Sequence, residues 1–193
     1  MKRIKRIVDT GFWSDEKIME FSPQLKYFWL FLLTNEYTSQ LGIYYLPIKK
    51  AAFDLGFPEQ KVKELINELI KNEMICFSFK TNEIAIKNYL IYSVVSGGKP
   101  VFDCLTKEMH QVKDKALLKY IYENLSKKEM PNNTIKDFKE SLFIYINDND
   151  NDNDNERIGF ESSTNRKRIV KKKTDIYDTV YDFEAMERQY GLK

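Results

Sequence analysis

The sequence predicts an α+β fold that is mainly helical, and three observations within residues 42–87 carry this prediction. Two stretches, residues 47–55 and 58–72, have the composition of helices and are separated by a short turn. In the longer stretch the apolar residues recur every three or four positions, the spacing of one helix face: Val62, Leu65, Ile66, Leu69 and Ile70. Behind them, residues 74–80 and 83–89 alternate or run apolar, which predicts a β-hairpin.

The boundaries of these elements have local causes. Pro47 is tolerated in the first turn of a helix, and Gly56 is free to take the positive φ that ends one. Asn82 tolerates the left-handed conformation of a tight hairpin turn, and a strand begins near Gly42. Two helices joined by a short glycine turn form a helix-turn-helix, and a hairpin directly behind them is typical of the winged helix-turn-helix.

The segment ahead of this unit predicts a short strand and two helices. Residues 2–8 alternate basic and apolar side chains, as an exposed strand does. Ser14 and Ser22 stand where hydroxyl N-caps begin helices. The second helix, residues 23–34, is apolar nearly all round, which indicates burial in a small core. We expect four further aromatic residues to join that core: Phe12, Trp13, Phe31 and Phe53.

Helical signals continue beyond the hairpin and then fade. Residues 101–126 predict one or two more helices, which pack on the winged helix or on another copy of the chain. From residue 130 the signal weakens, although four apolar residues suit one or two further helical turns: Phe138, Leu142, Phe143 and Ile146. The strict Asp-Asn alternation of residues 148–155 has no apolar side chain to bury, so we expect a flexible linker there.

The chain therefore divides into four expected parts. Residues 1–95 form a winged-helix domain, residues 96–129 a helical extension, and residues 130–165 a linker that contains the Asp-Asn repeat. Residues 166–193 form a basic segment and a short amphipathic C-terminal peptide. On this prediction the fold ends in a disordered tail.

Composition and motifs narrow the function classes. The longest apolar run, residues 27–33, is far below the roughly 20 residues that span a bilayer, so we expect a cytoplasmic protein with no membrane partner. Cys76 and Cys104 lack the spacing of a metal site. There is one histidine, His110, and no phosphate-binding loop or nucleophile motif, which favours a protein that is not an enzyme and has no cofactor.

Charge and placement favour a nucleic-acid partner. Residues 1–129 carry 20 basic and 16 acidic groups, so this part is mildly basic. In the longer helix, the side chains that suit base edges in a major groove are Gln60, Lys61, Lys63 and Asn67. Phosphate contacts are expected from Lys49, Lys50, Lys80 and Lys87, with Asn82 at the hairpin tip. Because glutamates match the lysines of that helix in number, a protein-docking role for it stays open.

The last part of the sequence holds two further candidate binding segments. Six cations fall within residues 166–173: Arg166, Lys167, Arg168, Lys171, Lys172 and Lys173. This cluster suits a solubilising tail, contact with the phosphate backbone, or contact with an acidic protein. Behind it, Ile176, Val180, Phe183 and Tyr190 share one helical face, which suits docking into a partner's groove or packing on the chain's own domain.

Several strings of the sequence resemble a known family. They are KRIKRIVDTGFWSDEKI, EFSPQLKYFWLFLLTN, QLGIYYL, KKAAFDLGF, TNEIAIKNYL, GGKPVFDCL and VKDKALLKYIYENL. Together they cover about residues 1–128 and resemble the N-terminal part of replisome organisers and DnaD-like replication proteins from phages and prophages of Gram-positive bacteria. The resemblance implies a winged helix that binds origin DNA, self-associates, and helps to bring in the replicative helicase or its loader.

The chain departs from that family after the Asp-Asn repeat. No second DnaD-type domain with the YxxxIxxW-like motif associated with single-stranded DNA binding follows, so the resemblance does not imply remodelling activity. Three hypotheses result: a replication initiation protein that binds double-stranded DNA as a homo-oligomer, a winged-helix transcription regulator, and a protein-only adaptor.

Overall fold

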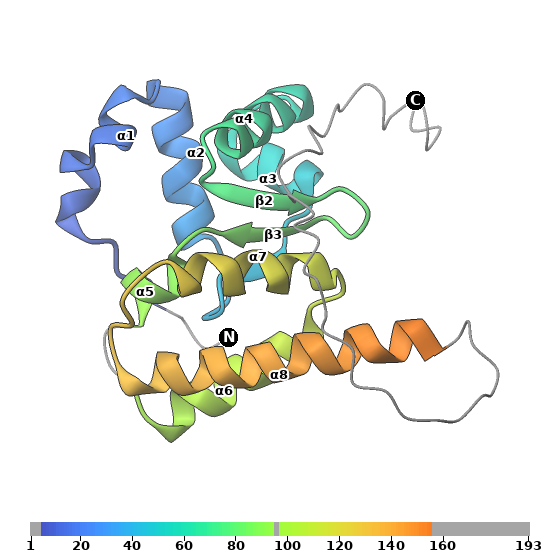
Figure 1. Cartoon of the computed structure of the whole chain (residues 1–193). Coiled ribbons are helices and arrows are strands. Elements are labelled where there is room, and N and C mark those ends of the chain that lie inside the picture. The colour runs from blue at the N-terminus through green and yellow to red at the C-terminus, as the bar shows by residue number, and fades with distance from the viewer. Residues whose placement is uncertain (1–4, 95–96, 156–193) are drawn as a thin grey trace, which may run out of the picture. The chain divides into compact units, whose positions relative to one another are not determined.

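The fold is mainly helical and contains one small antiparallel sheet of three strands, in agreement with the expected α+β class (Figure 1). The computed structural model describes residues 5–94 and 97–155. These described residues belong to a single compact unit.

The N-terminal helices begin at side-chain caps. A 3₁₀ turn, η1 (Thr10–Ser14), leads into α1 (Glu16–Glu20) and α2 (Pro23–Thr34). As predicted, Ser22 caps α2: its Oγ accepts a hydrogen bond from the Leu25 N–H at 3.2 Å. The other predicted cap, Ser14, is wrong, because the Asp15 carboxylate accepts the first amides of α1 instead. The expected strand is also wrong over residues 5–8, which have no regular structure.

The central elements follow the predicted order. They are β1 (Ile43–Tyr45), α3 (Ile48–Leu55), α4 (Glu59–Lys71), β2 (Ile75–Ser78) and β3 (Glu83–Ile86). Gly56 ends α3 at φ 68° and Asn82 turns the hairpin at φ 53°, both as expected from their tolerance of positive φ. The predicted return strand is too long, because Asn88 at φ 58° turns the chain into α5 (Tyr89–Ser93).

Both faces of the sheet are buried. The strand order is β1-β3-β2, and Ile84 of β3 lies opposite Tyr44 on one side and Phe77 on the other. These three residues face the core formed with α2, α3 and α4, whereas Ile43 and Ala85 face a second core formed with the later helices. In Figure 1, α3 and α4 accordingly lie on one side of the sheet and α7 on the other.

Three helices form the second layer: α6 (Lys99–Gln111), α7 (Lys115–Ser126) and α8 (Asn133–Asn155). The expected helical extension is therefore two helices, α6 and α7, and it shares a core with the sheet, which agrees with the first of the two expected packing alternatives. Helix α7 contacts β2 and β3, and α8 contacts α6 and α7.

Most of the segment that was expected to be a linker, from residue 130 onward, is the helix α8. Ile135, Phe138 and Leu142 lie at helical spacing and are fully buried between α6 and α7. The start of α8 is also tied down, since Thr134 Oγ1 accepts a hydrogen bond from the Gly98 N–H at 2.7 Å. The helix continues through the Asp-Asn repeat to Asn155, so the expected linker is wrong for residues 133–155, whereas the helical turns expected around Phe138, Leu142, Phe143 and Ile146 are confirmed.

Two expected core residues lie at the surface. Phe12 is buried and Phe31 packs against the core, as predicted. Trp13 is 62% exposed and makes an edge contact with Phe12, and Phe53 is 83% exposed. Phe53 lies at the surface because α3 turns Ala51, Ala52 and Leu55 toward the core and so leaves position 53 on the outer side.

Candidate nucleic-acid interface

The outward face of α4 carries more carboxylates than amines. Its inward face is buried through Val62, Leu65, Ile66 and Leu69. The exposed residues of the helix are Glu59, Gln60, Glu64, Glu68 and Lys71. Among the residues predicted to read bases, only Gln60 is exposed, and Lys61, Lys63 and Asn67 are half-buried.

Several of the lysines predicted to contact DNA form ion pairs with carboxylates. Lys61 Nζ lies 3.6 Å from Glu64 Oε2 one turn along α4. Lys87 Nζ lies 3.2 Å from Glu73 Oε2, which joins the return strand of the hairpin to the end of α4. At each of these two lysines a carboxylate competes with DNA for the ammonium group.

Lys50 is the most engaged of the predicted set. Its ammonium forms an ion pair with Asp54 one turn along α3 and lies 3.8 Å from Glu36. The hydrogen bond to Asp54 raises the pKa of Lys50 above its ordinary value. The same ammonium lies 5.9 Å from the centre of the Phe53 ring.

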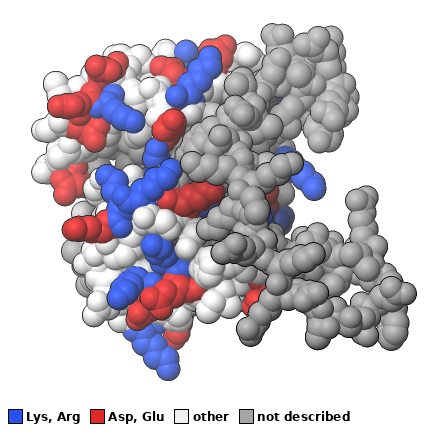
Figure 2. Space-filling view, in the orientation of Figure 1, with Lys and Arg blue, Asp and Glu red and all other residues white. Residues whose placement is uncertain are grey.

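Lys49 and Lys80 are both exposed, and they lie on different parts of the fold. Lys49 lies in the first turn of α3, and Lys80 lies in the connection between β2 and β3 next to Asn82. In the described part of the chain neither lysine forms an ion pair. Figure 2 shows that blue cations and red carboxylates are interspersed over the described part of the face in view.

The structure reveals a buried glutamate that the sequence analysis missed. Glu83, at the start of β3, is 5% exposed. Its Oε1 accepts a hydrogen bond from the Lys113 N–H at 3.0 Å, and its Oε2 accepts one from the Asp114 N–H at 2.9 Å. A glutamate beside a polar turn has no local feature that predicts burial, because the donors come from a segment 30 residues away.

A second carboxylate makes a similar bridge between the second layer of helices and the rest of the fold. Glu108 of α6 accepts hydrogen bonds from the Gln40 N–H at 3.1 Å and the Leu41 N–H at 2.7 Å. It therefore holds the loop that precedes β1, whereas Glu83 holds the hairpin. The spacing of the sequence contains no signal for either bridge.

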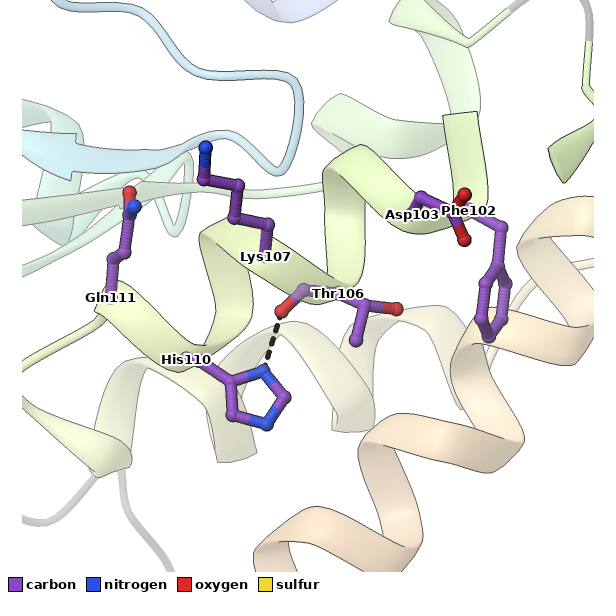
Figure 3. Close-up of a pocket in the computed structure, with 6 residues that line it drawn as sticks. All are labelled: Phe102, Asp103, Thr106, Lys107, His110 and Gln111. Carbon is purple, nitrogen blue, oxygen red and sulfur yellow. Dashed lines mark hydrogen bonds between the residues drawn. The ribbon is translucent and has the colours of Figure 1, made fainter. Parts of the chain in front are cut away.

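An open depression of about 560 Å³ lies along α6 (Figure 3). Its lining residues all belong to this helix: Phe102, Asp103, Thr106, Lys107, His110 and Gln111. His110 Nδ1 lies 2.7 Å from the Thr106 carbonyl oxygen, so this ring nitrogen is occupied by the helix backbone. Among the described residues, no three His, Cys, Asp or Glu side chains come together as a metal site would require.

The two cysteines lie in a strand and a helix, as expected, and both are free thiols. Burial raises the pKa of Cys76 to about 11. Burial also raises the pKa of Cys104, and the neighbouring Glu108 carboxylate acts in the same direction. Both thiols therefore stay protonated at neutral pH.

The tail candidates lie outside the described residues. They are the basic cluster Arg166, Lys167, Arg168, Lys171, Lys172 and Lys173, and the apolar set Ile176, Val180, Phe183 and Tyr190.

Comparison with models of protein families found no match, and comparisons with curated proteins and with solved structures found none. None of the helices in the described residues has the length and apolar character needed to cross a membrane.

Proposed function

We propose that the chain is a DNA-binding protein built on a winged helix-turn-helix. The observation that carries the proposal is the strand order β1-β3-β2 combined with the sequence of elements β1, α3, α4, β2 and β3. A two-helix unit joined at a left-handed Gly56 and followed directly by a hairpin is the arrangement of this class. Helix α4 is then the recognition helix and the β2–β3 hairpin is the wing.

The proposed contacts use three elements. Gln60 and the neighbouring Lys61 and Lys63 of α4 face the major groove, where amide and ammonium groups pair with base edges. Lys80 of the hairpin and Lys49 of α3 hold phosphates on either side of the groove. The ion pair between Lys61 and Glu64 does not prevent such contacts, because exposed ion pairs contribute only about 0 to 1 kcal/mol.

The cellular role we propose is replication initiation of the phage or prophage type. The protein binds origin DNA as a homo-oligomer in the cytoplasm, and its tail recruits the replicative helicase or its loader. This finer proposal is supported by the resemblance of residues 1–128 to replisome organisers and DnaD-like proteins. A winged-helix transcription regulator would use the same DNA-binding surface without a helicase partner.

A protein-only adaptor is the second candidate, and one observation favours it. Three of the five exposed residues of α4 are glutamates and one is a lysine, so carboxylates outnumber amines on the most exposed part of the helix. Phosphates repel such a face, whereas a basic partner protein is attracted to it.

Footprinting of the full chain on its own gene and the flanking DNA tests the proposal. The family resemblance implies binding sites within or beside the initiator gene, so repeated protected sites are the expected result. Absence of protection at any site, together with unchanged mobility of duplex DNA in gel shifts, favours the adaptor.

Removal of residues 166–193 separates the initiator from the regulator. An initiator without this segment protects its sites but fails to start replication from an origin plasmid. A regulator keeps its effect on a reporter promoter, because its function needs only the DNA-binding surface.

A further inference from the structure

The β2–β3 hairpin is held at its tip by the second layer of helices. Glu83 starts the return strand, and its carboxylate accepts the N–H groups of Lys113 and Asp114, which connect α6 to α7. Within the hairpin, the Thr81 hydroxyl also donates to Glu83 Oε2 at 2.8 Å. One buried carboxylate therefore joins the turn of the hairpin to the start of α7.

The acceptor of these hydrogen bonds is a carboxylate group, and their lengths are 2.8 to 3.0 Å. An ionised carboxylate that accepts backbone N–H groups forms shorter and stronger hydrogen bonds than a neutral acceptor does. The donors lie at the N-terminal end of α7, where the helix dipole favours negative charge. Because Glu83 is buried, loss of either donor leaves part of a carboxylate without a partner and without water.

The strands of the hairpin are short, with four residues each. Along the strands the hairpin is held by the pairing of β3 with β1 and by the two cores, so the turn is the part where a single side-chain link has the most effect. Helix α7 packs on the face of β2 and β3 that points away from α3 and α4, but Lys80 at the tip is exposed. At the tip, Glu83 makes the link to the α6–α7 connection, the Asn82 carbonyl oxygen accepts a hydrogen bond from the Leu46 N–H at 2.8 Å, and Phe79 packs against the first core.

We infer that Glu83 is a positioning residue for the wing: it couples the hairpin tip to the α6–α7 connection and so presents Lys80 and Asn82 in one fixed arrangement. This inference rests on the proposed function for its DNA consequence. A wing fixed before binding loses less conformational freedom on the DNA, so the coupling raises affinity without any contact between Glu83 and DNA. The layer formed by α6, α7 and α8 then contributes to DNA binding indirectly, since it sets the position of the wing.

Glu108 provides a matched control because it makes the same type of bridge at a different place. It also accepts two backbone N–H groups across the two layers, but these belong to Gln40 and Leu41 ahead of β1. A Glu→Gln change at either position leaves the shape of the side chain and replaces one acceptor oxygen by a donor. The two variants therefore differ in whether the hairpin loses its support.

The experiment compares the full chain with its Glu83→Gln and Glu108→Gln variants by amide hydrogen exchange and by duplex DNA binding. For Glu83→Gln we expect exchange at Lys113, Asp114 and the hairpin turn to accelerate about tenfold or more. We expect the DNA affinity of this variant to fall about three- to tenfold. For Glu108→Gln we expect faster exchange at Gln40 and Leu41, with the hairpin and the DNA affinity unchanged.

Unchanged exchange of the hairpin in Glu83→Gln, or the same acceleration there in Glu108→Gln, overturns the inference. If Glu83→Gln does not fold, Thr81→Val serves instead, because it removes only the hydroxyl that donates to Glu83 and should accelerate exchange of the turn severalfold. If the wild-type chain binds no DNA, the proposed function fails, and the exchange data still decide whether Glu83 holds the hairpin.

Discussion

Gly42 lies directly against Tyr89. A Cβ atom on Gly42 would lie 2.6 Å from the Tyr89 Cβ, and Gly42 has φ +79°, which side-chain-bearing residues rarely adopt. The Gly42 carbonyl oxygen also accepts a hydrogen bond from the Ile86 N–H at 2.9 Å, so the contact lies where β1 meets the end of β3. The approach of β1 to the start of α5 therefore requires glycine at position 42.

We predict that Gly42→Ala destabilises the protein by about 2 to 4 kcal/mol, because it adds a steric clash to a left-handed backbone. Gly56→Ala is the control, since Gly56 has φ +68° but no atom within 4 Å of its added Cβ. It should cost about 1 to 2 kcal/mol. Urea denaturation measures both, and equal midpoints for the two variants would contradict the close approach at Tyr89.

Helix α8 should behave as part of the core. Phe138 is fully buried, whereas Phe143 is 49% exposed five positions later on the same helix. We predict that Phe138→Ala lowers the free energy of unfolding by about 3 to 5 kcal/mol, while Phe143→Ala lowers it by less than about 1 kcal/mol. Equally small losses of unfolding free energy in both variants would contradict the packing of α8 and favour a linker over residues 130–155.

The thiol of Cys76 should react slowly while the protein is folded. Its pKa is raised from 9.0 to about 11, so the thiolate fraction at pH 8 is roughly a hundredfold lower than in the unfolded chain. Alkylation of a Cys104→Ser variant with iodoacetamide isolates this thiol. We expect slow labelling at pH 8 in buffer and fast labelling in urea, and equal rates would refute the burial of Cys76.

The same shift predicts how stability depends on pH. The thiol of Cys76 ionises near pH 9 in the unfolded chain and only near pH 11 in the folded protein. Its contribution to the free energy of unfolding is therefore fully present below pH 9. It is lost as the pH rises through 11. Urea midpoints of wild type and Cys76→Ala at pH 8 and pH 10.5 measure this, and the gap between them should shrink at the higher pH.

Lys80 should contribute to DNA affinity through the phosphate backbone. We predict that Lys80→Ala weakens binding to all duplex sequences alike and reduces the salt slope by about 1. Lys136→Ala is the control, because Lys136 is also exposed but lies on α8. Loss of affinity at one sequence only, or an equal loss in both variants, would remove Lys80 from the phosphate contacts.

Elements with strong local signals could be predicted from the sequence. The apolar spacing of 58–72, the Ser22 cap and the positive φ of Gly56 and Asn82 each follow from the residue itself and its near neighbours. Helix α8 could not be predicted over its full length, because its burial depends on contacts with α6 and α7 that no local pattern contains.

The candidate site was less predictable than the fold. Placement of Lys61 and Lys63 on α4 follows from helical spacing, but their half-burial depends on how the helix packs. Lys87 pairs with Glu73, and buried Glu83 accepts a hydrogen bond from the Asp114 N–H, so both contacts join residues far apart in sequence. Charge counts treat such residues as solvated ions, and only the three-dimensional arrangement shows which of them are engaged.

The salt dependence of duplex binding tests the central proposal most directly. If about five lysines contact phosphates, the logarithm of the association constant falls against the logarithm of salt concentration with a slope of roughly −4 to −5. Fluorescence anisotropy of the full chain with a labelled duplex, measured between low and physiological salt, gives this slope. A slope of that size supports DNA binding through the phosphate backbone, and a slope near zero, or no binding at the lowest salt, would contradict it.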